Sequence, residues 1–189
     1  SPGVYTFDKI DHDLNYLSRN GKKLWVQLQD RFFNLQDRSL PNYLFTGAQY
    51  DGSLARQVDN PGEGLPPEMG WVAKQWNPHV RARYQKLIAE LARRFDGKIY
   101  GINLPETSAD IDMQREFAGG FSCDKYFDAT TENINFVRAS FKKSYVVQYV
   151  NFWPCEWEND HRYMSRFFEN AAAKGIGLGG PDIVPYRKA

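Results

Sequence analysis

Apolar positions along the chain alternate between helical spacing and short continuous runs. A first helical pattern begins at Thr6 or Asp8 and stops at Asn20-Gly21, a usual helix end. A short apolar run over residues 23–29 then predicts a strand. The alternation continues with helices predicted over about 77–95, 124–143 and 160–174 and strands predicted over about 98–106, 145–153 and 176–182.

The strongest helical pattern starts at Asn77. Asn is a favoured cap residue, and Pro78 occupies the first helical position, where its fixed φ suits a helix. Apolar residues then recur at helical spacing until Asp96-Gly97 ends the pattern. This stripe consists of Tyr84, Leu87, Ile88, Leu91, Ala92 and Phe95.

Alternating strands and helices predict parallel pairing with right-handed crossovers, in either an open doubly wound sheet or a barrel. A doubly wound sheet usually carries a glycine-rich turn after its first strand, and residues 28–32 contain no glycine. Polar or aromatic residues also stand at every predicted strand end, where they would converge on one rim. We therefore predict an α/β fold of the (β/α)8 TIM barrel type, partial in this chain. The strand-end residues are Gln27, Gln29, Asp30, Asn103, Glu106, Asn151, Trp153 and Asp182.

Residues of about 30–75 follow no regular period, because prolines and glycines interrupt them repeatedly. We predict a long loop insertion here, and connections of this length usually have a function. The loop, which includes Trp71, would arch over the rim and build part of a binding cleft or act as a lid. The alternative is a loop that only covers the barrel.

Composition and charge narrow the class of protein. The 189 residues are 42% hydrophobic and 15% aromatic, enough for a single domain over 1–189 with one core. The net charge is +1, from 24 basic and 23 acidic residues, which disfavours a nucleic-acid partner and favours an uncharged ligand. No apolar run approaches the roughly 20 residues that cross a bilayer, so we expect no membrane partner. The histidines lack the close spacing of a zinc site, and we expect no metal and no cofactor.

Glu106 is the main candidate for chemistry, because it ends the apolar run that follows the long helix. In a (β/α)8 barrel the active site lies on the loops at the carboxyl ends of the strands, so this carboxylate stands where a catalytic group is expected. The alternative is a surface Glu that caps the next turn, with Thr107 and Ser108 as ordinary loop residues.

In the order of its predicted strands and the residues at their ends, the chain resembles the retaining glycoside hydrolases of clan A, which have a (β/α)8 barrel. The opening residues 1–11 resemble the segment after the second barrel strand, and residues 23–29 would then be strand three. In this register Glu106 ends strand four, where the clan keeps its general acid/base. The run from Asn151 to Trp153 would end strand five, and Asp182 would end strand six.

The resemblance implies a hydrolase that cleaves O-glycosidic bonds of a neutral oligo- or polysaccharide. Glu106 would protonate the leaving oxygen and then activate water. The clan's nucleophile is a second Glu at the end of strand seven, and no residue of this chain is identified with it. The clan also places Asn directly before the acid/base Glu, whereas Leu104 and Pro105 separate Asn103 from Glu106 here. The missing strands would come from sequence outside this chain or from a partner chain.

Other classes stay open beside the hydrolase. A non-catalytic carbohydrate-binding barrel, or a truncated pseudoenzyme, would keep the aromatic residues and lack the second carboxylate. A lyase or aldolase would need a buried Lys or a metal cluster at the rim, and Lys98 lies at the wrong end of its strand. A purely structural role would leave Glu106 exposed and unpartnered, whereas a cleft lined by Asn151 and Trp153 would favour the carbohydrate functions.

Several side chains are candidates for sugar binding. Amides both donate and accept hydrogen bonds, and tryptophan rings offer flat apolar faces for sugar rings. Asp182 is either a substrate ligand or a turn cap beside Pro181. For each amide and each ring, a structural role is the alternative. The amides are Gln27, Gln29, Asn103 and Asn151, and the rings are Trp153 and Trp71.

The same register places Cys123 and Cys155 in the loops after strands four and five, on one rim. A disulfide between them would stiffen the wall beside Glu106 and would imply an oxidising compartment, so that the protein would be secreted or periplasmic. The alternative is two free thiols in a cytoplasmic protein.

Overall fold

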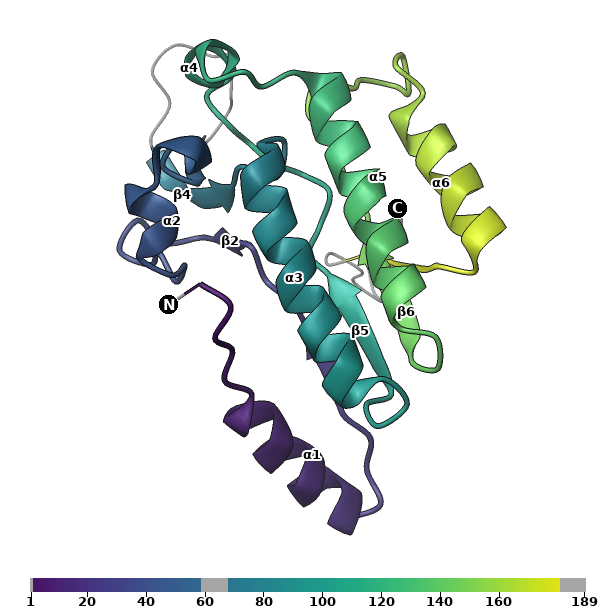
Figure 1. The fold of residues 1–189 in the computed structure, drawn as a ribbon. Coiled ribbons are helices and arrows are strands. Elements are labelled where there is room, and N and C mark those ends of the chain that lie inside the picture. Colours follow the sequence, from purple (N-terminus) through teal and green to yellow (C-terminus); the bar gives the residue numbers. More distant parts are fainter. Residues whose placement is uncertain (1, 59–67, 181–189) are drawn as a thin grey trace.

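The computed structural model describes residues 2–58 and 68–180, and its main element is a parallel sheet (Figure 1). The sheet has four strands in the order β1-β5-β6-β7, which is also their order along the chain. This result confirms the predicted α/β class with parallel strands. A closed TIM barrel is not seen, since the four strands form one open sheet. The strands are β1 (Trp25–Gln27), β5 (Gly101–Leu104), β6 (Tyr145–Tyr149) and β7 (Gly177–Gly179).

A helix connects each strand of the parallel sheet to the next. Figure 1 shows α3, α5 and α6 side by side on one face of the sheet, and α5 contacts both α3 and α6. The predicted helices are therefore present, with shifts of a few residues at their ends. Their bounds are α1 (Asp8–Arg19), α3 (Pro78–Phe95), α5 (Cys123–Ser140) and α6 (Tyr163–Lys174), and the short α4 (Met113–Ala118) precedes α5.

Helix α3 begins as its sequence predicts. The side-chain oxygen of Asn77 accepts hydrogen bonds from the backbone N–H groups of His79 and Val80, at 2.9 and 3.3 Å. These bonds satisfy two of the N–H groups that the first helical turn leaves without partners. The buried face of α3 contributes Ile88, Leu91 and Phe95 to the core between the sheet and the helices, alongside Ile102 of β5 and Val146 of β6.

The segment over about 30–75 is not the loop that we predicted. It forms a second, antiparallel sheet in the order β2-β4-β3, with its own small core around Phe32 and Trp71. A Cβ on Gly70 would lie 1.9 Å from the carbonyl oxygen of Phe32, so only glycine lets these strands approach so closely. The elements are β2 (Arg31–Phe32), α2 (Tyr43–Thr46), η1 (Ala48–Tyr50), β3 (Leu54–Val58) and β4 (Glu68–Ala73).

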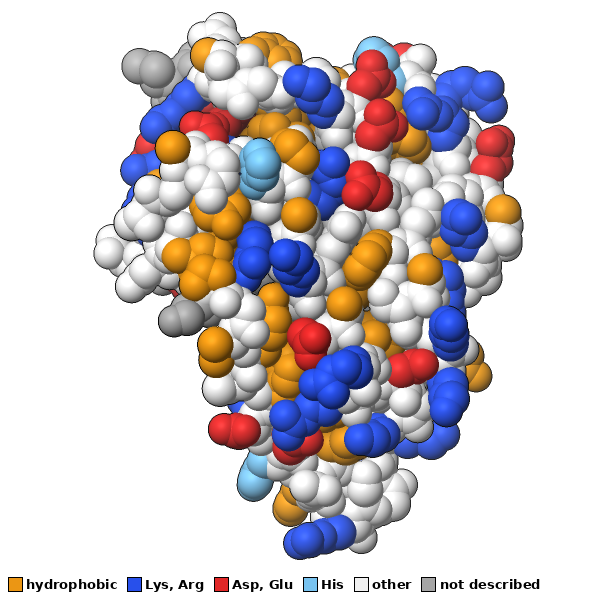
Figure 2. Space-filling model, in the orientation of Figure 1, with side chains coloured by type: hydrophobic (Ala, Val, Ile, Leu, Met, Phe, Trp, Pro, Cys, Tyr) orange, Lys and Arg blue, Asp and Glu red, His pale blue; other side chains and the backbone are white. Residues whose placement is uncertain are grey.

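The surface carries charges of both signs. Figure 2 shows Lys and Arg side chains interspersed with Asp and Glu over the helical face, in line with a net charge of +1. In the part of the chain that the structure describes, we find no helix with the length and apolar character needed to span a membrane.

Candidate active site

Glu106 lies two residues beyond the end of β5, at the carboxyl edge of the parallel sheet. Its side chain is half-buried. The neighbouring strand β6 ends at Tyr149, and Asn151 follows it at the same edge, since β5 and β6 run parallel. Parallel strands deliver the residues after their carboxyl ends to one side of a sheet, and here they bring Glu106 and Asn151 into contact.

One oxygen of the Glu106 carboxylate is held firmly. Oε2 accepts a hydrogen bond from Nδ2 of Asn151 at 2.5 Å and another from Oγ of Ser108 at 3.2 Å. Oε1 accepts no hydrogen bond from any residue in the described ranges. The carboxylate is thus oriented through one oxygen, and the other is left for a further contact.

The orientation of the Asn151 amide follows from its surroundings. Its Oδ1 accepts from the backbone N–H of Ser108 at 2.9 Å and from Oγ1 of Thr107 at 3.4 Å. Because a backbone N–H only donates, the carbonyl end of the amide must face Ser108. The NH2 end then faces Glu106 and donates to its carboxylate.

The backbone of residues 106–108 is fixed by a buried cation. One terminal nitrogen of Arg31, Nη1, donates to the carbonyl oxygens of Glu106 and Ser108. The hydroxyl of Tyr126 donates to the carbonyl oxygen of Thr107 at 2.8 Å. All three consecutive carbonyls therefore have side-chain donors, a network that holds the loop in one conformation.

The charge of Arg31 is balanced within the protein. Its side chain is 5% exposed, and its Nε donates to Oδ1 of Asp30 at 3.1 Å. Burial alone would lower the pKa of Arg31, but Tyr126 and Asp30 more than offset this effect and raise the pKa. Gln75 donates to the other oxygen of Asp30 at 3.1 Å, so both oxygens of that carboxylate are occupied. Burial raises the pKa of Tyr126, which keeps this hydroxyl a donor.

A small cavity of about 20 Å³ lies beside Glu106 and is also lined by Asp30, Gln75 and Gln148. This volume holds about one water molecule. A ligand larger than a water molecule would therefore have to contact Glu106 from the exposed side of its carboxylate rather than from this cavity.

The two tryptophan candidates do not line the small cavity beside Glu106. Trp153 is only 4% exposed, and its ring packs 5.1 Å from Phe127 and 5.3 Å from Phe167, between α5 and α6. Trp71 lies in β4 of the second sheet. The guanidinium groups of Arg38 and Arg56 stack on its ring at 3.9 and 4.0 Å. Trp71 is 6% exposed and, with Arg38 and Arg56, lines a separate hollow that Glu106 does not line.

The remaining candidate binding residues differ in their exposure to solvent. Gln27, at the end of β1, is exposed and contacts Gln29 at 3.5 Å. Asn103 is buried, and its Oδ1 accepts from Nε1 of Trp25 at 2.7 Å. Asp182 lies outside the described residues.

Cys123 and Cys155 are joined by a disulfide, with their Cα atoms 6.1 Å apart. The bond links the first residue of α5 to the loop between β6 and α6. The free-thiol alternative therefore does not describe this structure. Within the described ranges, no group of His, Cys, Asp and Glu is arranged to hold a metal ion.

Sequence reasoning missed Arg31, Tyr126 and Ser108 as parts of the site. Ser108 had a usable signal, because it lies two residues from Glu106 in the same loop. Arg31 and Tyr126 act on backbone carbonyls that are 75 and 19 residues away in the sequence, and no residue pattern encodes such contacts.

In comparisons with known proteins, no family model, no curated protein and no solved structure matches the chain.

Proposed function

We propose that this chain forms part of a (β/α)8-barrel glycoside hydrolase that cleaves a neutral oligo- or polysaccharide with retention, and that Glu106 is its general acid/base. The strand order supports the barrel. A doubly wound sheet reverses its strand order and carries helices on both faces. Here the order β1-β5-β6-β7 never reverses, and α3, α5 and α6 share one face.

The second face of the parallel sheet also suits the inside of a barrel. Val26, Ile102 and Val146 pack toward the helices, so the alternating residues of the strands point to the opposite face. Trp25 and Tyr145 lie on that face and are 39% and 59% exposed. Large aromatic rings that are left open on a sheet face indicate a surface that further structure covers.

The hydrogen bonding of Glu106 is the observation that carries the proposal. A general acid/base must present one oxygen to the glycosidic oxygen while the rest of the group is held still. Asn151 and Ser108 fix Oε2, and Oε1 is free of hydrogen bonds to the described residues. Glu106 donates its proton to the leaving oxygen in the first step and removes a proton from the attacking water in the second. The nucleophile would be a second carboxylate at about 5–5.5 Å, and we assign none of the described residues to this role.

A non-catalytic carbohydrate-binding barrel is the second candidate, and Asp30 favours it. Asp30 is the other carboxylate that lines the cavity beside Glu106, yet both of its oxygens are hydrogen-bonded, to Arg31 and Gln75. It cannot serve as a nucleophile without breaking its pair with Arg31. In this candidate Glu106 and Asn151 bind sugar hydroxyls, and no bond is cleaved.

The disulfide supports an exported protein, because disulfides persist in oxidising compartments. We infer that the protein works outside the cytoplasm, in the medium or the periplasm. Labelling the thiols of the protein isolated from its host tests this inference. Two reactive cysteines in the freshly isolated protein would contradict it.

The experiment that tests the function compares Glu106→Gln with the natural gene product on a panel of aryl glycosides and polysaccharides. Gln keeps the shape of the side chain but cannot transfer a proton, and general acid/base catalysis contributes about 10²–10⁴-fold to the rate. Glu169→Gln is the matched control, because Glu169 is exposed on α6. We expect cleavage by the natural product and by the control, with a loss of that size in Glu106→Gln.

Two further outcomes separate the candidates. Sugar binding that weakens in Glu106→Gln, without cleavage of any substrate by the natural product, would establish the binding barrel instead. Cleavage that survives in Glu106→Gln would remove Glu106 from the mechanism.

A further inference from the structure

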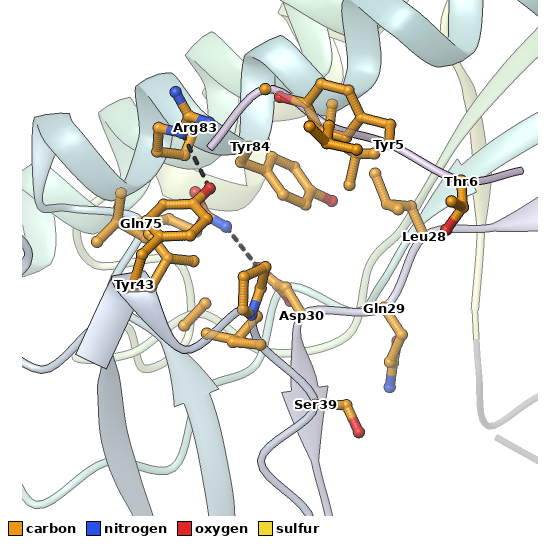
Figure 3. A pocket seen from close by; sticks show the side chains of 18 of the residues that line it. Tyr5, Thr6, Leu28, Gln29, Asp30, Ser39, Tyr43, Gln75, Arg83 and Tyr84 are labelled. Atoms are coloured by element: carbon orange, nitrogen blue, oxygen red, sulfur yellow. Dashed lines mark hydrogen bonds between the residues drawn. The ribbon is translucent and has the colours of Figure 1, made fainter. Parts of the chain in front are cut away.

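A second cavity has a volume of about 340 Å³ (Figure 3). Glu106 does not line it, but Asp30, Gln75 and Tyr84 line both this cavity and the small one beside Glu106. The walls of the second cavity come from residues 3–7, the segment after β1, the segment that leads into α2, the end of β4 and the N-terminal half of α3. This size lies in the range of small-molecule sites, about 300–1,000 Å³. The apolar part of the wall includes Phe7, Leu28, Leu40, Leu44, Val80 and Leu87.

Three polar atoms in this wall have no hydrogen-bond partner among the described residues. They are the hydroxyl oxygens of Tyr5 and Tyr84 and the Nη2 nitrogen of Arg83. Figure 3 shows the Tyr84 hydroxyl directed into the space beside Leu28 and Asp30. Buried polar groups are nearly always hydrogen-bonded, so unpartnered donors around a cavity indicate where a polar group of a ligand binds.

The charge of the cavity wall is positive. Arg83 forms no ion pair with any described residue, and its one side-chain hydrogen bond runs from Nε to the hydroxyl of Tyr43 at 3.0 Å. Asp30 also lines the cavity, but its charge is balanced by the buried cation of Arg31 at 3.1 Å. The unbalanced charge in the wall is therefore the Arg83 guanidinium.

The tyrosines beside Arg83 stay protonated at neutral pH. Burial raises the pKa of Tyr84 well above its ordinary value. Burial also raises the pKa of Tyr5, although the nearby Arg83 acts in the opposite direction. Both hydroxyls can therefore donate to an anion. A guanidinium and phenol donors next to an apolar chamber are complementary to a carboxylate on an apolar body.

We propose that this cavity is a binding site for a small organic monocarboxylate with an apolar ring or chain. The carboxylate pairs with Arg83 and accepts from the tyrosine hydroxyls, and the apolar part lies against Leu28, Leu44 and Val80. Glu106 does not line this cavity, so the proposal does not rest on the hydrolase function, although Asp30, Gln75 and Tyr84 also line the small cavity beside Glu106.

Calorimetric titration with phenylacetate at low ionic strength tests the proposal, with phenylacetamide as a neutral ligand of the same shape. We expect phenylacetate to bind about tenfold or more tightly than the amide, since a hydrogen bond to a charged group contributes that factor or more. Arg83→Gln should lose the same factor. The control is Arg93→Gln, because Arg93 lies on the same helix with a 72% exposed side chain.

A variant that fills the cavity keeps the test decisive if Arg83→Gln does not fold. Leu28→Phe adds volume inside the cavity, retains Arg83 and should abolish binding. Equal binding of acid and amide, or binding that Arg83→Gln and Leu28→Phe leave unchanged, would overturn the proposal. A neutral disaccharide that binds in place of phenylacetate, and loses affinity in Leu28→Phe, would overturn the carboxylate assignment and make the cavity a sugar site. No binding of phenylacetate at millimolar concentration would also overturn it.

Discussion

Replacing Arg31 by methionine is expected to destabilise the protein by about 3–5 kcal/mol, the usual effect of removing one partner of a buried ion pair. The Arg31 side chain is 5% exposed, and Asp30, its partner at 3.1 Å, is 7% exposed. Methionine fills similar space, so the packing changes little. The loss of stability arises because the buried carboxylate of Asp30 keeps its charge but has only Gln75 left as a donor. The carbonyl oxygens of Glu106 and Ser108 also lose their donor.

This magnitude is large beside the total stability of a domain, which is about 5–15 kcal/mol. Two further variants separate charge from packing. Arg31→Met combined with Asp30→Asn removes both charges and should cost less than Arg31→Met alone. Arg93→Met removes an exposed partner of Glu90 at 2.9 Å and should cost no more than about 0.5 kcal/mol.

Urea unfolding followed by tryptophan fluorescence measures these differences, provided that the slopes of the transitions agree. If Arg31→Met does not fold, Arg31→Lys replaces it, because a lysine keeps the charge but cannot reach Asp30 and both carbonyls together. If an Arg31 variant loses no more free energy of unfolding than Arg93→Met, the role assigned to the Arg31 cation is refuted.

Three other predictions concern the scaffold. Gly70→Ala should destabilise the second sheet, because the new Cβ would lie 1.9 Å from the Phe32 carbonyl oxygen; a melting temperature equal to that of the natural protein would contradict this. Burial would raise the pKa of Asp96, but backbone N–H groups before β6 lower it, so its contribution to stability is present at neutral pH and lost as the pH falls through its folded-state pKa. Melting curves of Asp96→Asn should therefore lose part of the acid sensitivity below about pH 4, and parallel pH profiles would argue against it. Reducing the Cys123–Cys155 bond, which spans 32 residues, should cost about 3–4 kcal/mol by chain entropy; urea curves that coincide with and without reductant would rule this out.

The parallel sheet and its helices could be predicted from the sequence because their patterns are local and long. Helix α3 carries its cap, its first proline and its apolar stripe within residues 77–95. The second sheet could not be predicted, since β2 has two residues and pairs with β4 some 40 positions later. Prolines and glycines interrupt the sequence of this segment, so no regular period is visible, and the close contact of Gly70 with Phe32 is nonlocal.

The candidate site was predictable to the level of the sheet edge. Glu106 and Asn151 were both expected at the carboxyl edge, and the structure joins them by a hydrogen bond. Trp153 was expected there too, but the chain has left β6 after Tyr149, and alternation no longer decides where a side chain points. The apolar environment between α5 and α6 then determines the position of the ring.

The segment over about 30–75 holds the loop that carries Glu106. Its strand β2 begins with Arg31, whose guanidinium holds the backbone of the Glu106 loop. Gln75, two residues after β4, holds Asp30, and Asp30 in turn holds Arg31. The pairing of β2 with β4 therefore sets the distance between these groups, so that a change inside the second sheet alters the loop without any contact to the carboxylate. A lid would act on exchange with solvent, whereas this arrangement acts on the position of Glu106 itself.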